Sequence, residues 1–406
     1  MSTSLLYHTQ GIKGFQHQSF VYEADSVIDH IARKNALACP ECYSYNITPT
    51  PLRTRRIQCN KSGQKQFYVE VTVHQIYCKD CKTISIEHFP FLSHPKSRIS
   101  LAFERTIVEL RSEMSISAIS KYFNLDWRTV KDCEKRFLKK KFRIIKLKNV
   151  RIIGMDEIYV TRVRGKEKYI TVVRDLESGA VLYVGKGKGA EALEDFGRRL
   201  RHSRCKIKAI AMDMSRGYTA WARENIPDAE IVFDHFHIIK LMNEKVDNIR
   251  RKTCAALDEE QRKLLKNQRF LFLRNVEDLE PDAELLLNNL RNMFKELGDV
   301  SMFKEALRGI YRKANSDFQA EAAFKNWCSM AKKTEIKELD DMAKTIEKNL
   351  TGITAYWRMA GMTNSSMEGF NNKIRWLIRQ AYGFRDDEYF TLKIYNLPNT
   401  KTESEL

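Results

Sequence analysis

The chain has 406 residues, too many for one ordinary hydrophobic core, so two to four domains are expected. Hydrophobic residues make up 43% and charged residues 30%, with only 8 Pro, a composition that excludes an intrinsically disordered protein. Lys and Arg number 70 against 52 Asp and Glu, and the resulting net charge of +18 favours a polyanionic partner such as nucleic acid.

No apolar run is long enough to span a bilayer, and the start, MSTSLLYHTQ, lacks the basic and then apolar order of a signal peptide. We therefore expect a cytoplasmic protein with no membrane partner. The 9 Cys are odd in number, which argues against a disulfide framework and favours metal ligation.

Two Cys-x-x-Cys pairs lie in the N-terminal region, Cys39 with Cys42 and Cys78 with Cys81. Each pair forms a tight turn that can aim two thiolates at one tetrahedral ion, so together they predict one structural Zn²⁺. The alternative is two buried or redox-active pairs.

The segment between the pairs alternates like a strand, as expected of a zinc ribbon; its apolar positions are Phe67, Val69, Val71 and Val73. Cys59 and His74 are possible substitutes as zinc ligands. The other cysteines are expected to be small buried hydrophobic residues.

Residues 101–139 predict three short helices, because apolar residues recur at helical spacing. The three faces carry Phe103, Ile107 and Leu110, then Ile116, Ile119 and Phe123, then Val130, Cys133 and Phe137. Ser115 can cap the second helix and Asp126 the third, and the short link between them suits a helix-turn-helix. A plain helical connector is the alternative, since such patterns are common by chance.

In a helix-turn-helix the third helix enters the major groove, so Arg128, Thr129 and Lys131 would meet base edges or phosphates. Basic residues follow directly: Lys139, Lys140, Lys141, Arg143, Lys146 and Lys148. Such a run is usually a solvated face, but beside two DNA-binding signals it favours a linker that follows phosphates.

From Arg151 the pattern changes to strands and then to alternating helices and strands. The expected strands are IIGMDEIYV, YITVVRDL, AVLYVGK, residues 207–212 and residues 230–233, and the expected helices are residues 190–200 and 215–224. The order βββαβαβα is that of ribonuclease-H-like nucleases and integrases, in which the first and fourth strands are neighbours.

Asp156 lies on the first of these strands, and Asp213 ends the fourth. Neighbouring strands would bring the two carboxylates together, a repulsion that cations relieve, so the pair predicts a Mg²⁺ or Mn²⁺ site. Taken singly, each Asp is equally explained as a solvated turn residue. Glu157 should point to the opposite face of the sheet. The glycine-rich residues 185–189 lack the spacing of a phosphate-binding loop, so no nucleotide cofactor is expected.

An all-helical insertion is predicted next, because few Gly or Pro interrupt its helical periodicity. After it, TNSSMEGFNNK places Glu368 in the first turn of a helix capped by Asn364 or a serine. There the carboxylate can complete the metal site, or simply favour the helix dipole. The same helix carries three DNA-binding candidates, Lys373, Arg375 and Arg379, of which the last two share a face.

With these motifs, the chain resembles the ISL3 family of bacterial insertion-sequence transposases over nearly its whole length. The matching segments are GMDEIYV, IKAIAMDMSRGY, IVFDHFHIIKLMNEKVDNIRR and TNSSMEGFNNKIRWLIRQAYGFRD, with the CPEC and YCKDC pairs. The resemblance implies an Asp-Asp-Glu triad at Asp156, Asp213 and Glu368 that holds two Mg²⁺ or Mn²⁺ ions. Asp234 and His237 resemble an Asp-x-x-His element near the active site of several transposases, and a helix cap explains them equally well.

The expected fold is multidomain α/β, with a ribonuclease-H-like catalytic core. The expected parts are a four-cysteine zinc-ribbon region (1–95), a helix-turn-helix with a basic linker (96–148), the core (149–240 and 355–400) and an all-helical insertion (241–354). The expected function is a DNA transposase that binds terminal inverted repeats, cleaves the element ends and joins the 3′-OH to target DNA. Its partner would be double-stranded DNA, bound by a homodimer on paired ends. The alternatives are a transcriptional regulator derived from a transposase and a structure-selective nuclease.

Overall fold

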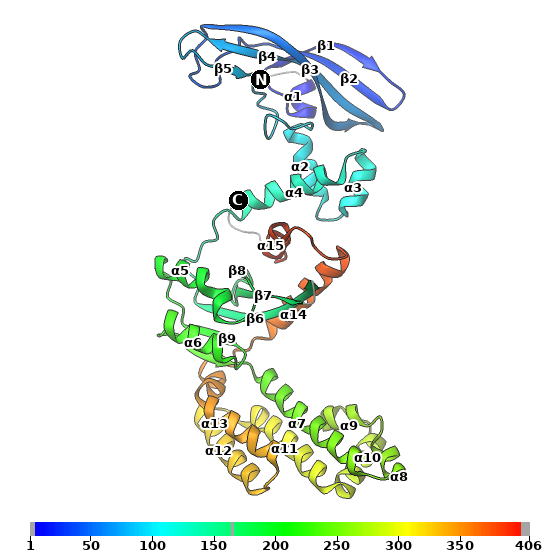
Figure 1. Ribbon diagram of the computed structural model, residues 1–406, viewed down its shortest axis with the longest axis vertical. Helices are drawn as coiled ribbons and strands as arrows, with labels where there is room; N and C mark the ends of the chain where they lie inside the picture. The colour runs from blue at the N-terminus through cyan, green and yellow to red at the C-terminus, as the bar shows by residue number, and fades with distance from the viewer. Residues whose placement is uncertain (1–4, 164–165, 399–406) are drawn as a thin grey trace. The chain divides into compact units, whose positions relative to one another are not determined.

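The computed structural model describes residues 5–163 and 166–398. The chain divides into two compact units, Met1–Arg143 and Ile144–Leu406 (Figure 1). Residues 1–4 of the expected N-terminal region and residues 399–400 of the expected core lie outside the described residues. None of the described helices combines the length and apolarity needed to cross a lipid bilayer.

The first unit contains a five-stranded sheet with the order β1-β2-β4-β3, in which β5 pairs with β4. Its elements are α1 (Leu5–Gln10), β1 (Phe15–Tyr22), β2 (Ser26–Arg33), β3 (Ile47–Ser62), β4 (Lys65–Cys78) and β5 (Ile84–Ile86). The four alternating apolar residues of β4, at positions 67, 69, 71 and 73, are all buried in one core, as their spacing predicts. The hairpin expected of a zinc ribbon is therefore present as β3 and β4, within a larger sheet.

Three helices complete the first unit: α2 (Leu101–Leu110), α3 (Ile116–Phe123) and α4 (Trp127–Lys141). Both predicted caps are confirmed, because Ser115 accepts a hydrogen bond from the Ala118 N–H and Asp126 accepts one from the Arg128 N–H. The prediction that Phe137 is buried is wrong. Phe137 is 41% exposed and Leu138 is buried instead, because the core shared with α2 and α3 includes Val130 and Cys133 but no later residue of α4.

The second unit is built around a mixed sheet with the order β10-β9-β6-β7-β8. Its strands are β6 (Ile152–Val163), β7 (Lys166–Asp175), β8 (Val181–Lys186), β9 (Ala209–Met212) and β10 (Glu230–Phe233). The connecting helices are η1 (Ala190–Leu193), α5 (Glu194–His202) and α6 (Arg216–Asn225). β6 pairs antiparallel with β7 and parallel with β9, so the first and fourth strands are neighbours, as predicted.

Different parts of the chain cover the two faces of this sheet. Met155 of β6 lies in one core with residues of α5 and α6. Ile158 lies in another core with residues of α14 (Ser365–Gln380) and α15 (Asp387–Asn396). Because side chains alternate along a strand, Asp156 lies on the face covered by α14, and Glu157 lies on the face covered by α5 and α6.

Every described element between β10 and α14 is helical. These elements are α7 (His235–Ala256), α8 (Glu259–Leu265), α9 (Arg269–Leu273), η2 (Val276–Asp278), α10 (Pro281–Met293), α11 (Lys295–Lys313), α12 (Asp317–Lys333) and α13 (Lys337–Arg358). The Trp327 indole N–H donates to the Phe303 carbonyl at 3.0 Å, and that of Trp357 donates to the Ala314 carbonyl at 2.9 Å. Both indoles therefore tie these helices together.

Candidate active site and metal site

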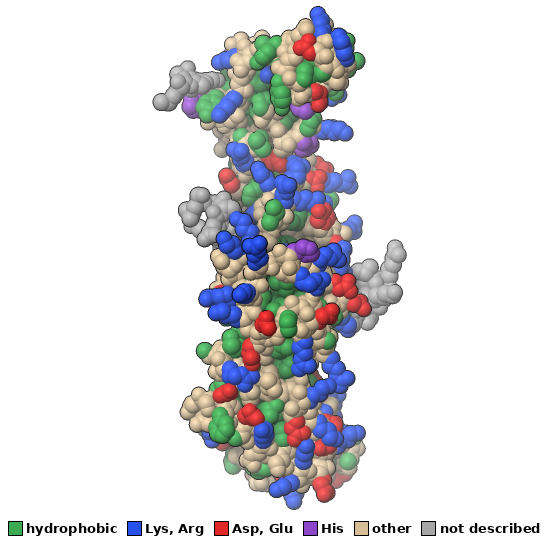
Figure 2. All heavy atoms as spheres, turned by 90° about the vertical axis from the view of Figure 1, so that its left-hand side faces the viewer, with side chains coloured by type: hydrophobic (Ala, Val, Ile, Leu, Met, Phe, Trp, Pro, Cys, Tyr) green, Lys and Arg blue, Asp and Glu red, His purple; other side chains and the backbone are tan. Residues whose placement is uncertain are grey.

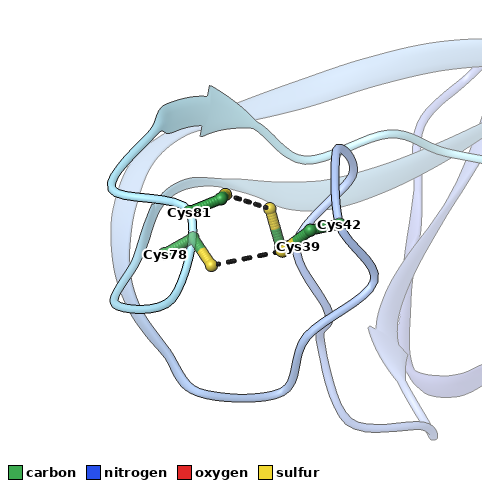
Figure 3. Close-up of side chains that lie close together, drawn as sticks. All are labelled: Cys39, Cys42, Cys78 and Cys81. Atoms are coloured by element: carbon green, nitrogen blue, oxygen red, sulfur yellow. Dashed lines mark hydrogen bonds between the residues drawn. The ribbon is translucent and has the colours of Figure 1, made fainter.

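The four cysteines of the Cys-x-x-Cys pairs lie together in the first unit (Figure 3). Their sulfur atoms all lie within 4.8 Å of one another. Cys39 Sγ is 3.7 Å from Cys81 Sγ, and Cys42 Sγ is 3.5 Å from Cys78 Sγ. A tetrahedral zinc ion with Zn–S bonds of about 2.3 Å needs sulfur atoms about 3.8 Å apart. The four thiols therefore fit one zinc ion, and no disulfide competes for them.

Hydrogen bonds hold the two cysteine turns in place. The Thr83 hydroxyl lies 2.9 Å from Cys81 Sγ and lowers the pKa of Cys81 to about 6, which favours the thiolate that binds metals. Asp80, next to Cys81, accepts hydrogen bonds from the Ser44 hydroxyl and, at 2.8 Å, from the Asn46 amide. These bonds join the second turn to the segment that follows the first.

Cys59 and His74, the two possible substitutes, do not belong to the cysteine cluster. Cys59 is buried in the sheet core, where desolvation raises its pKa to about 12. The Nδ1 atom of His74 lies 2.8 Å from Glu87 Oε2. The buried Glu87 also accepts hydrogen bonds from Arg33, so it forms a structural network.

Asp156 lies on β6, and Asp213 directly follows the end of the neighbouring strand β9. The register between β6 and β9 ends with Gly154 opposite Ala211, and two further residues bring Asp156 opposite Asp213. Asp213 Oδ1 accepts a hydrogen bond from the Ser215 N–H at 3.1 Å. Burial raises the pKa of Asp156, and the nearby charge of Asp213 adds to that rise. The charge of Asp213 therefore acts on Asp156, and their joint role in metal binding stays a prediction.

The start of α14 reaches β6 although the two are far apart in the sequence (Figure 1). The buried Asn371 donates a hydrogen bond to Asp156 Oδ2 at 2.6 Å, across 215 residues of chain. The Asn364 amide donates to the Met155 carbonyl at 3.2 Å. Asn364 occupies the predicted N-cap position, but its side chain makes no capping bond because it bonds to β6.

Two further features fix α14 against the sheet. Gly154 permits the close approach, since a Cβ atom there would lie 2.8 Å from Asn364 Oδ1. Arg174 of β7 donates to the Ser366 carbonyl at 2.8 Å, and its guanidinium lies 4.1 Å from the centre of the Phe370 ring. The first two turns of α14 are thus anchored beside Asp156.

Glu368 lies in the first turn of α14 and is exposed. It follows Asn364 by four residues and precedes Asn371 by three, so helical spacing places it on the edge of the face that bonds to β6. Among the described residues, only the four cysteines have ligand atoms all within 4.8 Å of one another. Asp156, Asp213 and Glu368 therefore do not form so close a group in the structure.

Asp234 and His237 lie at the start of α7, beside the two aspartates. Asp234 is buried and accepts a hydrogen bond from the Phe236 N–H at 3.2 Å, which caps α7. His237 Nδ1 is 3.8 Å from Asp234 Oδ2, too far for a hydrogen bond, so the pair interacts mainly through charge. Asp234 raises the pKa of His237, and the charges of Asp213 and Asp156 raise it further. Asp234 thus caps α7, and His237 lies within the electrostatic influence of Asp213 and Asp156.

Glu157 has a different environment from Asp156. Burial raises the pKa of Glu157, and the charge of Asp213 adds to the rise, whereas Lys188 lowers it. Glu157 also contributes to the rise in the pKa of Tyr218 of α6, whose value is about 12 chiefly because of burial. Glu157 thus lies near both α6 and the carboxylates.

The basic residues expected to contact DNA are at accessible positions. On α4, Arg128 is exposed, while Thr129 and Lys131 are half-buried. Lys131 Nζ lies 5.8 Å from the centre of the exposed Trp127 ring. Lys139 and Lys140 are exposed and Lys141 is half-buried near the end of α4, and Lys373, Arg375 and Arg379 are exposed on α14.

A βββαβαβα fold with Asp156 on its first strand, Asp213 directly after the neighbouring fourth strand, and a helix that returns to the first strand defines a ribonuclease-H-like nucleic-acid enzyme. A family model described as a transposase matches residues 153–394, and a model described as the helix-turn-helix domain of transposase family ISL3 matches residues 87–137. Since the first match covers more than half of the chain, the protein belongs to the ISL3 family of transposases. It is a DDE transposase of insertion sequences, which catalyses DNA cleavage and strand transfer and binds DNA through its helix-turn-helix. Enzymes of this class use divalent metal ions.

Similar proteins include two bacterial transposases. The transposase for insertion sequence element IS1001 of Bordetella parapertussis is 28% identical over 362 residues, which cover 88% of each chain. The transposase for IS1557 of Mycobacterium tuberculosis is 27% identical over 312 residues, 71% of this chain and 69% of that protein. The Drosophila P element transposase strand transfer complex aligns with a TM-score of 0.40 and 13% identity, covering 74% of this chain and 92% of that one.

Proposed function

We propose that Asp156, Asp213 and Glu368 form the catalytic triad of this transposase and hold two Mg²⁺ or Mn²⁺ ions. The observation that carries the proposal is the hydrogen bond of 2.6 Å between Asn371 and Asp156, because it anchors the helix of Glu368 beside the strand of Asp156. Carboxylate oxygens are the ligands that these hard cations prefer. The exposed Glu368 side chain can change rotamer at little cost to approach the two aspartates.

The hydrogen bonds that Asp156 accepts leave both of its oxygen atoms able to bind a metal ion. Asp156 Oδ1 accepts the Glu157 N–H at 2.8 Å and Oδ2 accepts the Asn371 amide, and each oxygen retains a lone pair for a metal ion. His237 would hold a proton beside the site, because Asp234 and the charges of Asp213 and Asp156 raise its pKa. When bound, the two ions would supply the charge that activates a water or a 3′-hydroxyl and stabilises the leaving 3′-oxygen.

The DNA substrate is proposed to be the terminal inverted repeats of the element, brought together by a homodimer. Arg128, Thr129 and Lys131 would read or position the repeat from α4. The lysines at the end of α4 and the basic residues of α14 would contact phosphates; these are Lys139, Lys140, Lys141, Lys373, Arg375 and Arg379.

One structural Zn²⁺ is proposed at Cys39, Cys42, Cys78 and Cys81. Its role is to support the region over residues 1–95, which precedes the helix-turn-helix and linker at 96–148. The catalytic core would then comprise 149–240 and 355–400, interrupted by the insertion at 241–354.

The test is a cleavage and strand-transfer assay on duplexes that carry the terminal repeats flanking the gene, in the presence of Mg²⁺. Asp156→Asn is expected to keep end binding and abolish cleavage, because it removes charge at the metal site with little change of shape. Asp213→Asn and Glu368→Gln should do the same. The control is Asp195→Asn, which changes an exposed carboxylate on α5 and should retain full activity. Full cleavage by Asp156→Asn would refute the assignment.

A further inference from the structure

A buried carboxylate lies where the catalytic core leads into the helical insertion. Figure 2 shows Lys, Arg, Asp and Glu side chains exposed at many places on the face that it draws. Asp234, in contrast, is 5% exposed, and within the described residues its side chain accepts one hydrogen bond, from the Phe236 N–H. A carboxylate has about four acceptor positions, and a buried one is stable when they are used. Asp234 therefore has room for about three more donors.

Three buried polar atoms in this region have no hydrogen-bond partner among the described residues. Two are imidazole nitrogens of α7: His235 Nδ1 lies 3.6 Å from Asp234 Oδ1, and His237 Nδ1 lies 3.8 Å from Oδ2. The third is the hydroxyl oxygen of Tyr311, on α11 of the insertion. Buried polar groups are normally hydrogen-bonded, so three unpaired ones in one place need an explanation.

The ring of Tyr311 and the carboxylate of Asp234 lie against the same imidazole. Figure 1 shows α7 and α11 side by side. The ring centre of His235 is 5.4 Å from that of Tyr311, and its Nδ1 atom is the one near Asp234. Burial raises the pKa of Tyr311, and the charge of Asp234 adds to the rise. The Tyr311 hydroxyl and the Asp234 carboxylate therefore influence each other across two helices.

Packing explains the ring of Tyr311 but not its hydroxyl. The ring stacks on Trp357 of α13, with ring centres 5.2 Å apart and an interplanar angle of 18°. It also lies 5.9 Å from the ring of Tyr356. A Phe side chain would make the same ring contacts without the cost of a buried hydroxyl that has no partner. The hydroxyl therefore indicates a role beyond packing.

We infer that Tyr311 is a positioning residue of the active site, whose hydroxyl acts on Asp234 and through it on the imidazole of His237. Hydrogen bonds at active sites are often long in the free enzyme and shorten in the complex with substrate. A carboxylate beside one ring nitrogen keeps the proton there and fixes the tautomer of the imidazole. The insertion thereby contributes to the reaction through α11. The inference rests on the proposed place of His237 beside the triad.

The test compares Tyr311→Phe with the wild-type full-length protein. Cleavage of a duplex that carries the terminal repeat flanking the gene is measured with Mg²⁺ and saturating DNA, so that the rate reports steps after binding. We expect an about 10-fold lower rate with an unchanged Kd for the duplex. The Tm should stay the same or rise, since the lost hydroxyl has no partner. A ring that serves packing alone would leave the rate unaltered.

A double-mutant cycle shows whether Tyr311 acts through His237. In a His237→Ala background, Tyr311→Phe should change the residual rate by no more than about 2-fold. A general loss of structure would instead lower the rate by the same factor in both backgrounds. The ring nitrogen signals of His237, in protein with isotopically labelled histidine, provide a second readout that does not depend on residual activity. Tyr311→Phe should shift them.

Tyr356→Phe is the matched control, because it removes a hydroxyl from the same aromatic cluster, at a ring centre 5.7 Å from that of His235. It should keep the wild-type rate and the His237 signals. A normal rate in Tyr311→Phe, an equal loss in Tyr356→Phe, unshifted His237 signals or equal losses in both backgrounds would overturn the inference. Full cleavage by His237→Ala would refute the proposed place of His237 and overturn the inference with it. Asp156→Asn tests the triad by itself, so the two proposals can fail separately.

Discussion

Asp156 is a residue whose charge opposes folding. Burial raises its pKa above the ordinary value of 3.8. A carboxyl with a raised pKa in the folded state contributes stability below its ordinary pKa and loses it as pH rises through the raised value. At pH 7 the ionised Asp156 therefore destabilises the metal-free protein. We predict that Asp156→Asn raises the Tm of the metal-free protein at pH 7, and that this gain shrinks toward pH 3.

The charge of Asp156 should also affect how much Mg²⁺ raises the Tm of the protein. Bound cations should offset the repulsion at the carboxylates, so Mg²⁺ should raise the Tm of the wild-type protein more than that of Asp156→Asn. Thermal denaturation with and without Mg²⁺ measures both effects. Asp195→Asn serves as the control and should respond to Mg²⁺ like the wild type. Equal stabilisation of wild type and Asp156→Asn by Mg²⁺ would contradict a role for Asp156 as a ligand.

Asn371 is a positioning residue, since it touches Asp156 and no reacting atom. Asn371→Ala removes the bond at 2.6 Å and lets the carboxylate turn. We expect cleavage to fall about 10- to 100-fold, with a rise in the Mg²⁺ concentration needed for half-maximal rate. Asn372→Ala changes the exposed neighbour, which bonds to Arg375, and should leave that concentration unchanged. A lower rate with an unaltered Mg²⁺ requirement would indicate a purely structural role.

At the scale of elements, the contact between α14 and β6 depends on Gly154. A Cβ atom at this position would lie 2.6 Å from Leu176 Cδ2 and 2.8 Å from Asn364 Oδ1. We predict that Gly154→Ala shifts α14, lowers the Tm and reduces cleavage while leaving end binding intact. Gly309→Ala is the matched control, because nothing lies within 4 Å of its added Cβ. This α11 variant should gain about 0.5 to 1 kcal/mol in free energy of unfolding and keep its activity. Normal cleavage by Gly154→Ala would show that the position of α14 needed for cleavage does not depend on the close contact at Gly154.

The elements that the sequence predicted are those determined by local patterns. The alternation through Val69 and Val71 located β4, and Ser115 and Asp126 located two helix starts. β1 gave no such signal, because after Phe15 all its residues are exposed. The bond from Asn371 to Asp156 was also beyond prediction, since a contact across 215 residues depends on how the sheet and α14 pack. The triad residues themselves were assigned by motif, and their convergence remains a proposal.

At the scale of the whole molecule, each hydrophobic core is made from residues of one unit. The cores around Val69 and Phe103 belong to the first unit, and those around Met155 and Ile158 belong to the second. The basic residues near the starts of β6 and β9 show what charge counts alone miss. Arg204, Lys206 and Lys208 alternate with less exposed residues in the sequence and carry no motif. They become one surface with Lys146 and Lys148 only because β6 and β9 are parallel neighbours.

This division predicts that loss of zinc affects DNA recognition and leaves the catalytic unit folded. The cysteine cluster joins residues 39–42 to residues 78–81, and Gln58 of β3 donates to the Phe123 carbonyl at 2.9 Å, which ties the sheet to α3. Cys78→Ser, or chelation, should therefore lower the melting transition of the first unit and weaken specific end binding. The melting transition of the second unit and its stabilisation by Mg²⁺ should stay the same.

Calorimetry and metal analysis measure these effects, with one zinc per chain expected in the wild type. Cys254→Ser, a half-buried cysteine of α7, is the control and should retain the zinc. End binding unchanged in a zinc-free protein would contradict the structural role of the cluster.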